Sequence, residues 1–441
     1  MWPGGCASRS TPSCNWEFEV GGIKRRVGLL HYSLPPVVGG VEAVIEAHTH
    51  CFLAAAYAVD LIAGEGAAEA LPAGSQFHHL PLLSSQHPRI LAVSTGLEKG
   101  EVPVDFAELK QAIAGALTPI LSELDTLIVH NVLSKHFNLP LTAAICQLLD
   151  EGVIRHCIAW GHDFTWTSPN SGHKVRPDYP WDLLRQQRED IHYVTISGQR
   201  QAELAGLFGC AREMISVVYN GVAPAELLGL TPAGADLVQR LNLFEADLIL
   251  LLPVRVTQAK NIEYALALLA ALRETGLDAR LIVTGPPDPH DENSLRYYRS
   301  LQARRAELGL AGVMHFIYEA GPYPEQGLVI DLPVVADLYR LADVLLLPSH
   351  REGFGMPVLE AGLLGMPVFA ATTVPAAVEI GAEEIFTFAP DLPAATLAQQ
   401  IYAFAVADNR LRLARQIRQH MSWPAIFREQ IEPLLPDQEI A

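Results

Sequence analysis

The segment SHREGFGMPVLEAGLLGMPVFA, residues 349–370, constrains the fold more than any other part of the chain. The apolar run at 344–348 precedes it and is typical of a strand that is buried on both faces of a parallel sheet. A loop with two glycines follows, and Pro357 then marks the first turn of a helix. A strand, a glycine loop and a helix in this order predict a ligand site at the carboxyl end of a parallel strand.

Two carboxylates accompany the start of this helix. Glu352 precedes the helix, and Glu360 lies within it. The free N–H groups at a helix start suit a phosphate, whereas ionised carboxylates accept hydrogen bonds from pairs of sugar hydroxyls. The segment therefore predicts a site for a polyhydroxylated, anionic ligand.

Length and charge narrow the class of protein. A chain of 441 residues exceeds the usual limit for one hydrophobic core, so two domains are expected. The formal charge of −18 argues against a nucleic-acid partner, because nucleic acid attracts basic surfaces. It argues less strongly against docking on anionic membranes, so peripheral contact with a membrane stays open.

The cysteines and the N-terminus favour a cytoplasmic protein. No C-x-x-C pair occurs, which is typical of reduced thiols. Residues 1–23 lack the apolar core of a signal peptide and have no readable role, and no run of about 20 apolar residues predicts a membrane span. The sixteen histidines show no metal-binding spacing, so no metal site is expected. The cysteines are Cys6, Cys14, Cys51, Cys146, Cys157 and Cys210.

Predicted strands alternate with predicted helices along the whole chain. This alternation predicts an α/β protein with two doubly wound, Rossmann-like parallel sheets, one in residues 24–221 and one in residues 222–421. A single closing helix is expected over 397–421, with Thr396 as its N-cap. Residues 422–441 form a last helical stretch after a break at Pro424.

Polar residues of the first half repeatedly follow predicted strands, where ligands of such sheets bind. His162 is expected to touch a sugar, because Gly161 and Asp163 flank it, whereas for His130 a direct and a structural role are equally open. The Gly39–Gly40 pair suits backbone contact with a phosphate or is a plain tight turn. The residues that follow strands are Gly39, Gly40, His130, Asn131, His162, Asp163, Ser197 and Asn220.

A pair of basic residues and one long segment are two further candidates for contact with a ligand. Arg255 and Lys260 follow the first strand of the second half, where a guanidinium fork and an ammonium point charge can clamp a diphosphate. The segment at 166–182, rich in proline and aromatic residues, either covers a cleft and contacts a second substrate or is an ordinary surface loop.

With these motifs in place, the chain resembles the retaining nucleotide-sugar glycosyltransferases of the GT-B class, in glycosyltransferase family 4. The resemblance rests on R-x4-K at Arg255 and Lys260 and on E-x7-E at Glu352 and Glu360, with VYNGV at 218–222 and GGVE after the first strand in support. It covers nearly all of residues 24–435. It implies two domains that face an interdomain cleft, with the C-terminal helix crossing back to the first domain.

The resemblance also implies roles for single residues. Arg255 and Lys260 hold the donor diphosphate as the leaving group, Glu352 contacts the transferred sugar, and Glu360 accepts from the ribose hydroxyls. Gly40 approaches the diphosphate from the opposite domain, and His162 lies near the sugar. The other implied contacts with the donor are Gly39, Asn220, Phe354, Gly355, Met356, Pro357 and Val358, with Gly285 and Ile317 beside the base. His130, Asn131 and Asp163 are expected on the acceptor side.

The expected reaction is transfer of a hexose from a nucleoside-diphosphate sugar, with UDP or GDP as the carrier, to an acceptor hydroxyl of unknown identity. No D-x-D pair is placed to hold a cation, so transfer without metal and without a further cofactor is expected. Same-face displacement is favoured, because Glu352 is the only motif carboxylate near the sugar. The alternatives are a sugar phosphorylase or nucleotide-sugar epimerase of the same fold and a non-catalytic nucleotide-sugar binding protein.

Overall fold

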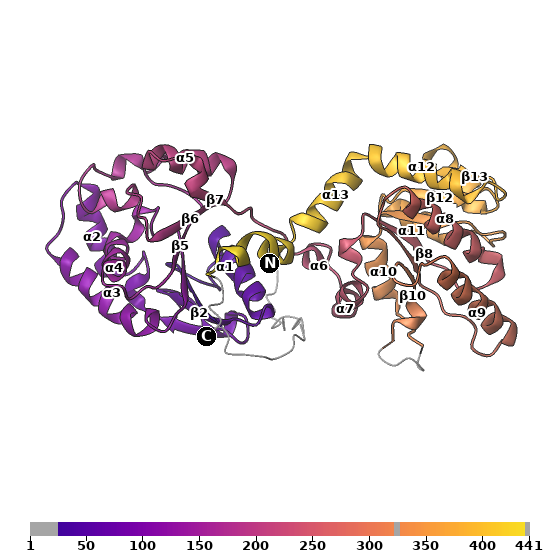
Figure 1. The fold of residues 1–441 in the computed structure, drawn as a ribbon, viewed down its shortest axis with the longest axis horizontal. Helices are drawn as coiled ribbons and strands as arrows, with labels where there is room; N and C mark the ends of the chain where they lie inside the picture. Colours follow the sequence, from indigo (N-terminus) through magenta and orange to yellow (C-terminus); the bar gives the residue numbers. More distant parts are fainter. Residues whose placement is uncertain (1–24, 322–326, 437–441) are drawn as a thin grey trace, which may run out of the picture. The chain divides into compact units, whose positions relative to one another are not determined.

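A computed structural model describes residues 25–321 and 327–436 of the chain (Figure 1). The described residues form two compact units. The first contains residues 25–221 together with 423–436, and the second contains residues 222–422. The expected N-terminal segment at 1–23 lies outside the described residues.

The first domain is built on a parallel sheet of seven strands in the order β3-β2-β1-β4-β5-β6-β7. Its strands are β1 (Arg26–Leu30), β2 (Ala58–Ala63), β3 (Gln76–His79), β4 (Thr126–His130), β5 (Cys157–Gly161), β6 (Ile191–Thr195) and β7 (Ile215–Val217). Its helices are α1 (Gly40–Ala54), α2 (Pro88–Glu98), α3 (Asp105–Leu121), α4 (Leu139–Asp150), α5 (Gly198–Phe208) and the short α14 (Trp423–Ile426). Strand order reverses between β1 and β4, as in a doubly wound sheet.

The second domain repeats this plan with six parallel strands in the order β10-β9-β8-β11-β12-β13. Its strands are β8 (Leu248–Leu252), β9 (Ala279–Val283), β10 (Met314–Phe316), β11 (Val344–Leu347), β12 (Val368–Ala371) and β13 (Phe386–Phe388). Its helices are α6 (Pro224–Leu227), α7 (Pro232–Arg240), α8 (Ile262–Glu274), α9 (Glu292–Glu307), α10 (Leu332–Leu341), α11 (Met356–Leu363), α12 (Ala394–Ala407) and α13 (Asn409–His420). The predicted fold class, two Rossmann-like parallel-sheet domains, is confirmed.

Continuous apolar runs explain why both sheets are parallel and covered on two faces. All residues of β8 (LILLL) and β11 (VLLL) are buried, because helices cover both sides of a parallel sheet. A polar side chain within β8 or β11 would be removed from water without a hydrogen-bond partner, which costs free energy. The polar residues of a site are therefore expected beyond the ends of these strands.

The chain passes from the first domain to the second at residues 221–222 and returns at 422–423. The two crossing points are adjacent, because the backbone N–H of Val222 donates to the carbonyl of Met421 at 2.9 Å. The returning residues complete the first domain's core, where the ring of Phe427 packs against Phe52 with centroids 5.0 Å apart. The C-terminal residues thus return to the first domain, as the resemblance implied.

The expected single helix over 397–421 is wrong. The structure has two helices, α12 and α13, because the carboxylate of Asp408 accepts from the backbone N–H groups of Arg410 and Leu411 and so caps a new helix start. Thr396 is not an N-cap either, since α12 already begins at Ala394. Helix α2 was not expected, although Pro88 occupies its first turn.

The segment at 166–182 is partly core. The side chains of Val175 and Trp181 are buried, and the indole N–H of Trp166 donates to the carbonyl of Trp181 at 3.2 Å. Packing therefore holds this segment on the first domain, and its predicted contact with a second substrate stays a prediction.

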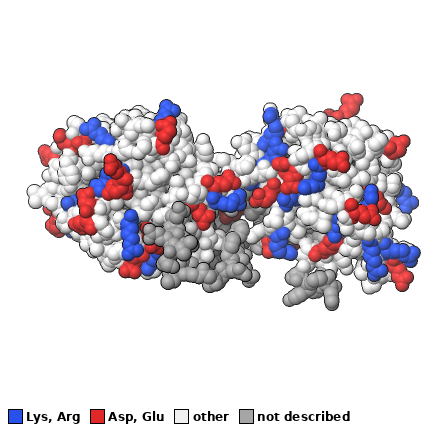
Figure 2. Space-filling model, in the orientation of Figure 1, with Lys and Arg blue, Asp and Glu red and all other residues white. Residues whose placement is uncertain are grey.

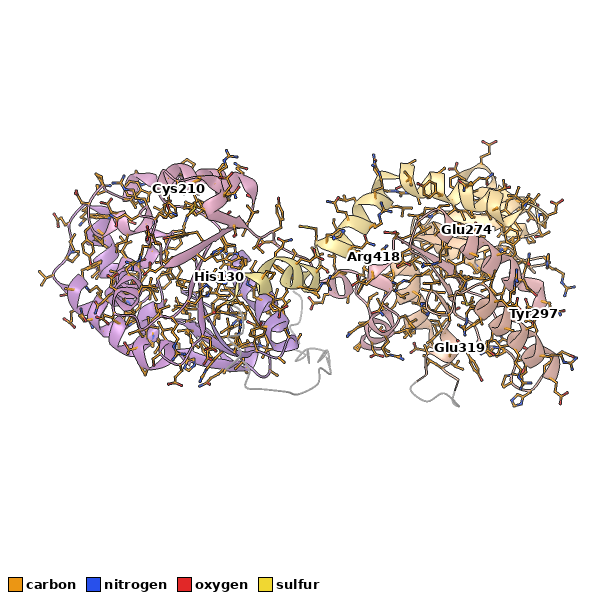
Figure 3. The ribbon with its side chains drawn as sticks, viewed as in Figure 1. His130, Cys210, Glu274, Tyr297, Glu319 and Arg418 are labelled. Carbon is orange, nitrogen blue, oxygen red and sulfur yellow. The ribbon has the colours of Figure 1, made fainter. Side chains whose placement is uncertain are left out.

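A buried ion pair of Arg418, which Figure 3 labels, fastens α13 to the second domain. Nη2 of Arg418 lies 3.2 Å from Oδ2 of Asp343, and less than a tenth of either side chain is exposed. The same carboxylate oxygen accepts from the backbone N–H of Ile249 in β8 at 2.8 Å. Arg418 also donates to the carbonyl of Ala246 at 2.8 Å.

We predict that Arg418→Ala lowers the free energy of unfolding of the second domain by about 3–5 kcal/mol, because Asp343 would remain buried without a cation. Urea unfolding followed by circular dichroism, with hydrogen exchange of β8 and α13, measures the loss. The matched control is Arg415→Ala, whose guanidinium lies 4.0 Å from Asp247 and is more exposed, so it should cost about 0–1 kcal/mol. Equal losses in the two variants would contradict this account.

Candidate active site

The reversal of strand order in the second sheet lies between the adjacent strands β8 and β11. The loop after β8 carries Arg255 and Lys260, and the loop after β11 carries Glu352 and the two glycines. Ligands of open α/β sheets bind at this point, beyond the carboxyl ends of the two strands. The topology therefore brings together the two motifs that the sequence keeps about 90 residues apart.

An ion pair joins the two loops. Nζ of Lys260 lies 2.6 Å from Oε1 of Glu352, with 21% and 11% of the two side chains exposed. The hydroxyl of Ser349 donates to the same Oε1 at 2.9 Å. Because both bonds fall on Oε1, Oε2 can accept from a ligand.

Backbone contacts reinforce this ion pair. The N–H of His350 donates to the carbonyl of Ala259 at 2.9 Å, and the amide of Asn261 donates to the carbonyl of Pro348 at 3.1 Å. Asn261 adopts left-handed backbone with φ of 51°, a conformation that asparagine tolerates better than most residues. These bonds therefore tie the loop after β8 to the loop after β11.

Gly355 permits the turn into α11. Its φ is +105°, and a Cβ there would lie 2.5 Å from Cγ1 of Val374. The carbonyl of Phe354 accepts from the N–H of Ala376 at 2.8 Å, which fixes the loop. Phe354 and Met356 are exposed. Pro357 lies in the first turn of α11, and Val358 lies on the buried face of the same helix.

Glu360 is exposed on α11, but its carboxylate is oriented by a partner. The hydroxyl of Tyr339 donates to Oε2 of Glu360 at 2.5 Å. Burial, together with this bond, raises the pKa of Tyr339, which keeps the hydroxyl protonated as a donor. Oε1 of Glu360 can accept from ligand hydroxyls.

Arg255 and Gly285 lie next to each other where β8 and β9 end. A Cβ on Gly285 would lie 2.5 Å from the carbonyl oxygen of Val254 and 2.7 Å from Cα of Arg255, so only glycine fits. The guanidinium of Arg255 is exposed and has no ion pair within residues 25–321 and 327–436. Ile317, expected beside the base, is fully buried and would not reach a ligand without movement.

In the first domain, His130 ends β4, Asn131 follows it, and His162 and Asp163 follow β5. The side chain of Asn131, at φ of 59°, accepts from the backbone N–H of His162 at 2.9 Å. Nδ1 of His130 lies 3.1 Å from Nε2 of His162, and Nδ1 of His31 donates to the carbonyl of His130 at 2.8 Å. The structure thus brings His130, Asn131 and His162 together, and it adds His31, which the sequence did not single out.

Asp163 does not stand alone beside His162. Its carboxylate accepts from Nζ of the buried Lys135 at 2.9 Å and lies 3.4 Å from the guanidinium of Arg200. These cations keep the pKa of Asp163 below its ordinary value against the opposing effect of burial. Its role is therefore at least partly to neutralise a buried lysine.

The remaining predicted residues are placed as follows. Gly39 caps α1, and the carboxylate of Glu42 lies against it, where it accepts from the hydroxyl of Ser33 at 2.7 Å. Gly40 has open space on its side. Asn220 is exposed after β7, and Ser197 caps α5 by accepting from the N–H of Arg200. The ligand contacts predicted for Gly39, Gly40 and Asn220 stay predictions.

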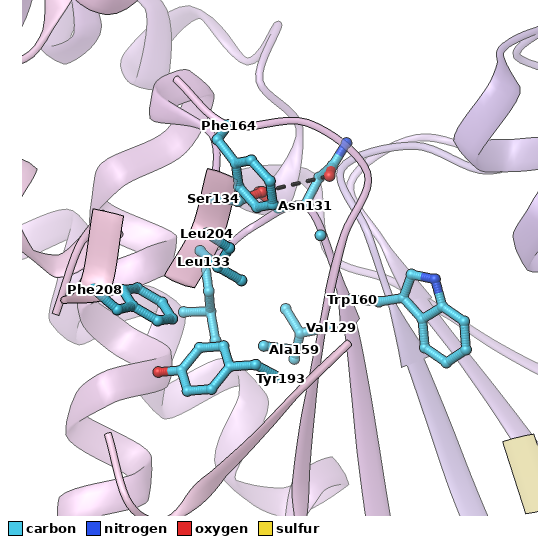
Figure 4. Close-up of a pocket in the computed structure, with 11 residues that line it drawn as sticks. Val129, Asn131, Leu133, Ser134, Ala159, Trp160, Phe164, Tyr193, Leu204 and Phe208 are labelled. Carbon is cyan, nitrogen blue, oxygen red and sulfur yellow. Dashed lines mark hydrogen bonds between the residues drawn. The ribbon is translucent and has the colours of Figure 1, made fainter. Parts of the chain in front are cut away.

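A small cavity lies beside these loops on the α5 side of the first sheet (Figure 4). Leu133, Tyr193, Leu204 and Phe208 line it, with Ser134 and Asn131 at one end. Its volume of about 10 Å³ is close to the least that holds one water molecule, so it is too small for a sugar.

On the face shown in Figure 2, basic and acidic side chains are interspersed over both domains. Across the described residues, no group of three or more His, Cys, Asp or Glu side chains could hold a metal ion. A search of the same residues finds no helix long and apolar enough to cross a membrane.

Comparison with known families tests the second domain directly. Residues 235–419 match the family model described as glycosyl transferases group 1, and this range contains Arg255, Lys260, Glu352 and Glu360. The second domain is thus similar to glycosyl transferases of group 1 over residues 235–419.

Curated relatives match over a similar length. The chain is 33% identical over 184 residues to a D-inositol 3-phosphate glycosyltransferase of Actinosynnema mirum, which is 41% of each chain. It is 31% identical over 228 residues to a protein of the same name from Saccharomonospora viridis, which is 50% of each chain. The chain thus matches from about two fifths to half of the length of these relatives.

Solved structures are similar over more of the chain but at lower identity. Alr3699/HepE of Anabaena, in complex with UDP and glucose, is 19% identical with a TM-score of 0.35, over 93% of this chain and 99% of that chain. Sucrose-phosphate synthase from Thermosynechococcus elongatus is 17% identical with a TM-score of 0.34, over 93% and 98%. The fold assignment rests on the two sheets themselves.

One sequence signal for this site was overlooked. Lys260 is the only lysine after Lys174, whereas arginine supplies every other basic side chain of the second domain apart from histidine. A single lysine among arginines places a compact ammonium group, and not a guanidinium fork, at this position. Ser349 and Tyr339, which orient the two glutamates, carry no such signal.

Burial of the first-domain histidines generates a pH prediction. Burial lowers the pKa of His48 to about 3 and that of His162 to about 4, so both rings are neutral in the folded protein at pH 7. In the unfolded chain they bind protons below about pH 6.5, so acid favours the unfolded state. Stability of this domain should therefore fall from pH 7 to pH 5, with about 2 kcal/mol of the loss due to His48.

His48→Phe should remove that share of the loss, because a phenyl ring keeps the edge contacts with Trp160 and Trp423 but binds no proton. Urea unfolding at pH 7 and pH 5, followed by tryptophan fluorescence, measures the difference. Trp160, Trp166, Trp181 and Trp423, the four described tryptophans, all belong to this domain. An unchanged pH dependence in the variant would contradict the assignment.

Proposed function

We propose that the chain is a retaining glycosyltransferase that moves a hexose from a nucleoside-diphosphate sugar to an acceptor hydroxyl without a metal ion. The observation that carries the proposal is the Lys260–Glu352 ion pair at the β8–β11 reversal, inside the range that matches group 1 glycosyl transferases. It joins a cation for a diphosphate to a carboxylate for a sugar in one site.

Lys260 and Arg255 supply the countercharge that the departing diphosphate needs. The ammonium has three N–H donors, and its bond to Glu352 leaves the others for phosphate oxygens. Arg255 adds an exposed guanidinium fork that fits two oxygens at once. At the start of α11, Pro357 has no N–H and the N–H of Val358 donates to the carbonyl of Gly355, so the two cations supply most of the countercharge that a metal ion would give.

Glu352 and Glu360 each bind one of the two sugars of the donor. Glu352 accepts from a hydroxyl of the transferred hexose through Oε2, and Glu360, held by Tyr339, accepts from the ribose hydroxyls. A carboxylate already paired with an ammonium is a weak nucleophile. We therefore propose same-face displacement: the bond from the anomeric carbon to the phosphate oxygen breaks, the acceptor oxygen bonds to that carbon, and its proton passes to the departing phosphate.

Lys260→Ala should abolish transfer, with a loss of about 10²–10³-fold or more in kcat, while the fold survives. Turnover of the donor sugar measures the loss, and circular dichroism checks the fold. Arg410→Ala, which removes an exposed cation of the same domain outside the site, is the matched control and should keep wild-type turnover. Near-normal turnover of the Lys260→Ala variant would contradict the proposed function.

Binding of the true donor should stabilise the folded protein. A bound ligand at 100 times its Kd adds about 2.7 kcal/mol of stability, so the true donor raises the melting temperature by mass action. UDP, GDP and ADP sugars are compared by thermal shift, and we expect a shift with a UDP or GDP sugar. No shift with any of them would argue against the donor site.

Acylation of the Lys260 amine independently tests whether the donor binds at this site. Because no other lysine follows Lys174, mass spectrometry of any later lysine-containing peptide reports Lys260 alone. The true donor should protect this amine from acylation. Release of sugar phosphate from a disaccharide and inorganic phosphate would instead indicate a phosphorylase.

A further inference from the structure

A histidine and a glutamate face each other at the reversal of strand order in the first sheet. His31 directly follows β1, and Glu42 lies in the first turn of α1. Nε2 of His31 lies 4.0 Å from Oε1 of Glu42, which is too far for a hydrogen bond, and only 7% and 12% of the two side chains are exposed. Ligands of open α/β sheets bind at this reversal, so the pair lies where a ligand is expected.

The other nitrogen of the His31 ring fixes the position of its hydrogen. Nδ1 lies 2.8 Å from the carbonyl oxygen of His130. A carbonyl oxygen can only accept, so Nδ1 carries the hydrogen. Burial lowers the pKa of His31, and the bond to His130 and the charge of Glu42 oppose this effect only in part. The ring is therefore neutral at pH 7, and its Nε2 is an acceptor without a hydrogen.

The groups that surround this nitrogen are acceptors as well. The hydroxyl of Ser33 donates its one hydrogen to Oε1 of Glu42 at 2.7 Å, and the carboxylate itself only accepts. Among the residues that the structure describes, Nε2 of His31 has no hydrogen-bond partner, yet it is not one of the fully buried unpaired atoms. Solvent therefore reaches it, and its donor must come from outside the chain.

The start of α1 supplies donors beside these acceptors. Its N-cap, Gly39, has no side chain to cap the helix, so the first N–H groups of α1 have no partner within the helix. A Cβ on Gly40 would meet open space, so a ligand can approach this backbone closely. Hydroxyl groups suit such a place, because each can donate to an acceptor and accept from an N–H.

Charge argues for a neutral ligand next to this pair. A cation would meet the positive end of the α1 dipole, and an anion would meet the carboxylate of Glu42. The two acceptors, Nε2 of His31 and Oε1 of Glu42, each need a hydrogen, and a single hydroxyl has only one. Two neighbouring hydroxyl groups of one molecule can satisfy both acceptors.

We propose that His31 and Glu42 bind two neighbouring hydroxyl groups of a neutral, polyhydroxylated ligand. His130 is the positioning residue of this site, because its carbonyl holds His31 in the tautomer that accepts. The identification of this ligand as the acceptor rests on the proposed glycosyl transfer, in which Glu352 and Glu360 already bind the sugars of the donor. The acceptor is then a polyol or a sugar, and it carries more than the one hydroxyl that reacts.

Nitrogen NMR tests the site without any activity assay. The full chain is labelled with ring-¹⁵N histidine at pH 7.5, and the loss of signals in His31→Asn assigns His31. We expect a hydrogen on Nδ1, none on Nε2, and a saturable shift of the Nε2 signal on addition of glucose, myo-inositol or glycerol. Propan-1-ol, which has a single hydroxyl, should cause no saturable shift.

Three results of this experiment would overturn the proposal. The first is a hydrogen on Nε2 of His31, which would make this nitrogen a donor. The second is a saturable shift with methylammonium or inorganic phosphate and with none of the polyols, which would indicate a charged ligand. The third is no saturable shift with any of these probes, which would mean that the pair holds water only.

Two variants separate binding from packing. In His31→Asn the amide N–H₂ takes the place of Nδ1 and can still donate to the carbonyl of His130, but no acceptor replaces Nε2. We expect this variant and Glu42→Gln to weaken polyol binding about tenfold or more, as measured by saturation-transfer NMR of the polyol signals. His50→Asn, which changes an exposed histidine of α1, is the matched control and should keep the wild-type affinity. Circular dichroism checks each fold, and unchanged affinity in a folded His31→Asn variant would contradict the proposal.

Kinetics with the polyol that binds tests its identity as the acceptor. His31→Asn should raise the KM of the acceptor about tenfold and leave kcat and the KM of the donor near their wild-type values, because it removes a contact made equally before and during the reaction. A loss of kcat at an unchanged acceptor KM would overturn the binding role. Absence of transfer by the wild-type chain would refute the proposed function alone, because the NMR result on polyol binding would stand.

Discussion

The ion pair between Lys260 and Glu352 is the interaction on which the second domain's site depends. It joins two loops that leave the sheet from neighbouring strands, and hydrogen bonds from the backbone of His350 and the side chain of Asn261 hold these loops together. Burying most of both charges is costly unless each satisfies the other, and here Ser349 adds a third group. The domain thus holds a cation and a carboxylate ready for ligand, at the one place where its strand order reverses.

The first domain presents a different kind of side chain where its own strand order reverses. Its strand order also reverses between the first and fourth strands, but the loops there present neutral rings instead of opposite charges. His130 and His162 lie together because β4 and β5 are paired and end at the same level, with His130 opposite Trp160. Buried histidines whose pKa values are lowered make this domain sensitive to acid.

Long apolar strands and strand-loop-helix order are visible in the sequence, and so the two sheets and the Arg255, Lys260, Glu352 and Glu360 motifs could be predicted. Local hydrogen bonds were less visible. The break at Asp408 was missed because the apolar pattern continues across it, and only the cap separates α12 from α13. His31 and Tyr339 act through partners far away in the chain, which spacing along one sequence does not reveal.

The return of the chain at residue 423 has a consequence for synthesis. The first domain's core contains Phe427 against Phe52 and Ile431, which is fully buried, so its last pieces are made after the entire second domain. Domains usually fold as they emerge from the ribosome, from the N-terminus onward. Here the second domain has all its residues first, and the first domain must wait, with the side chain of Phe52 on α1 uncovered, until Phe427 and the residues around it are made.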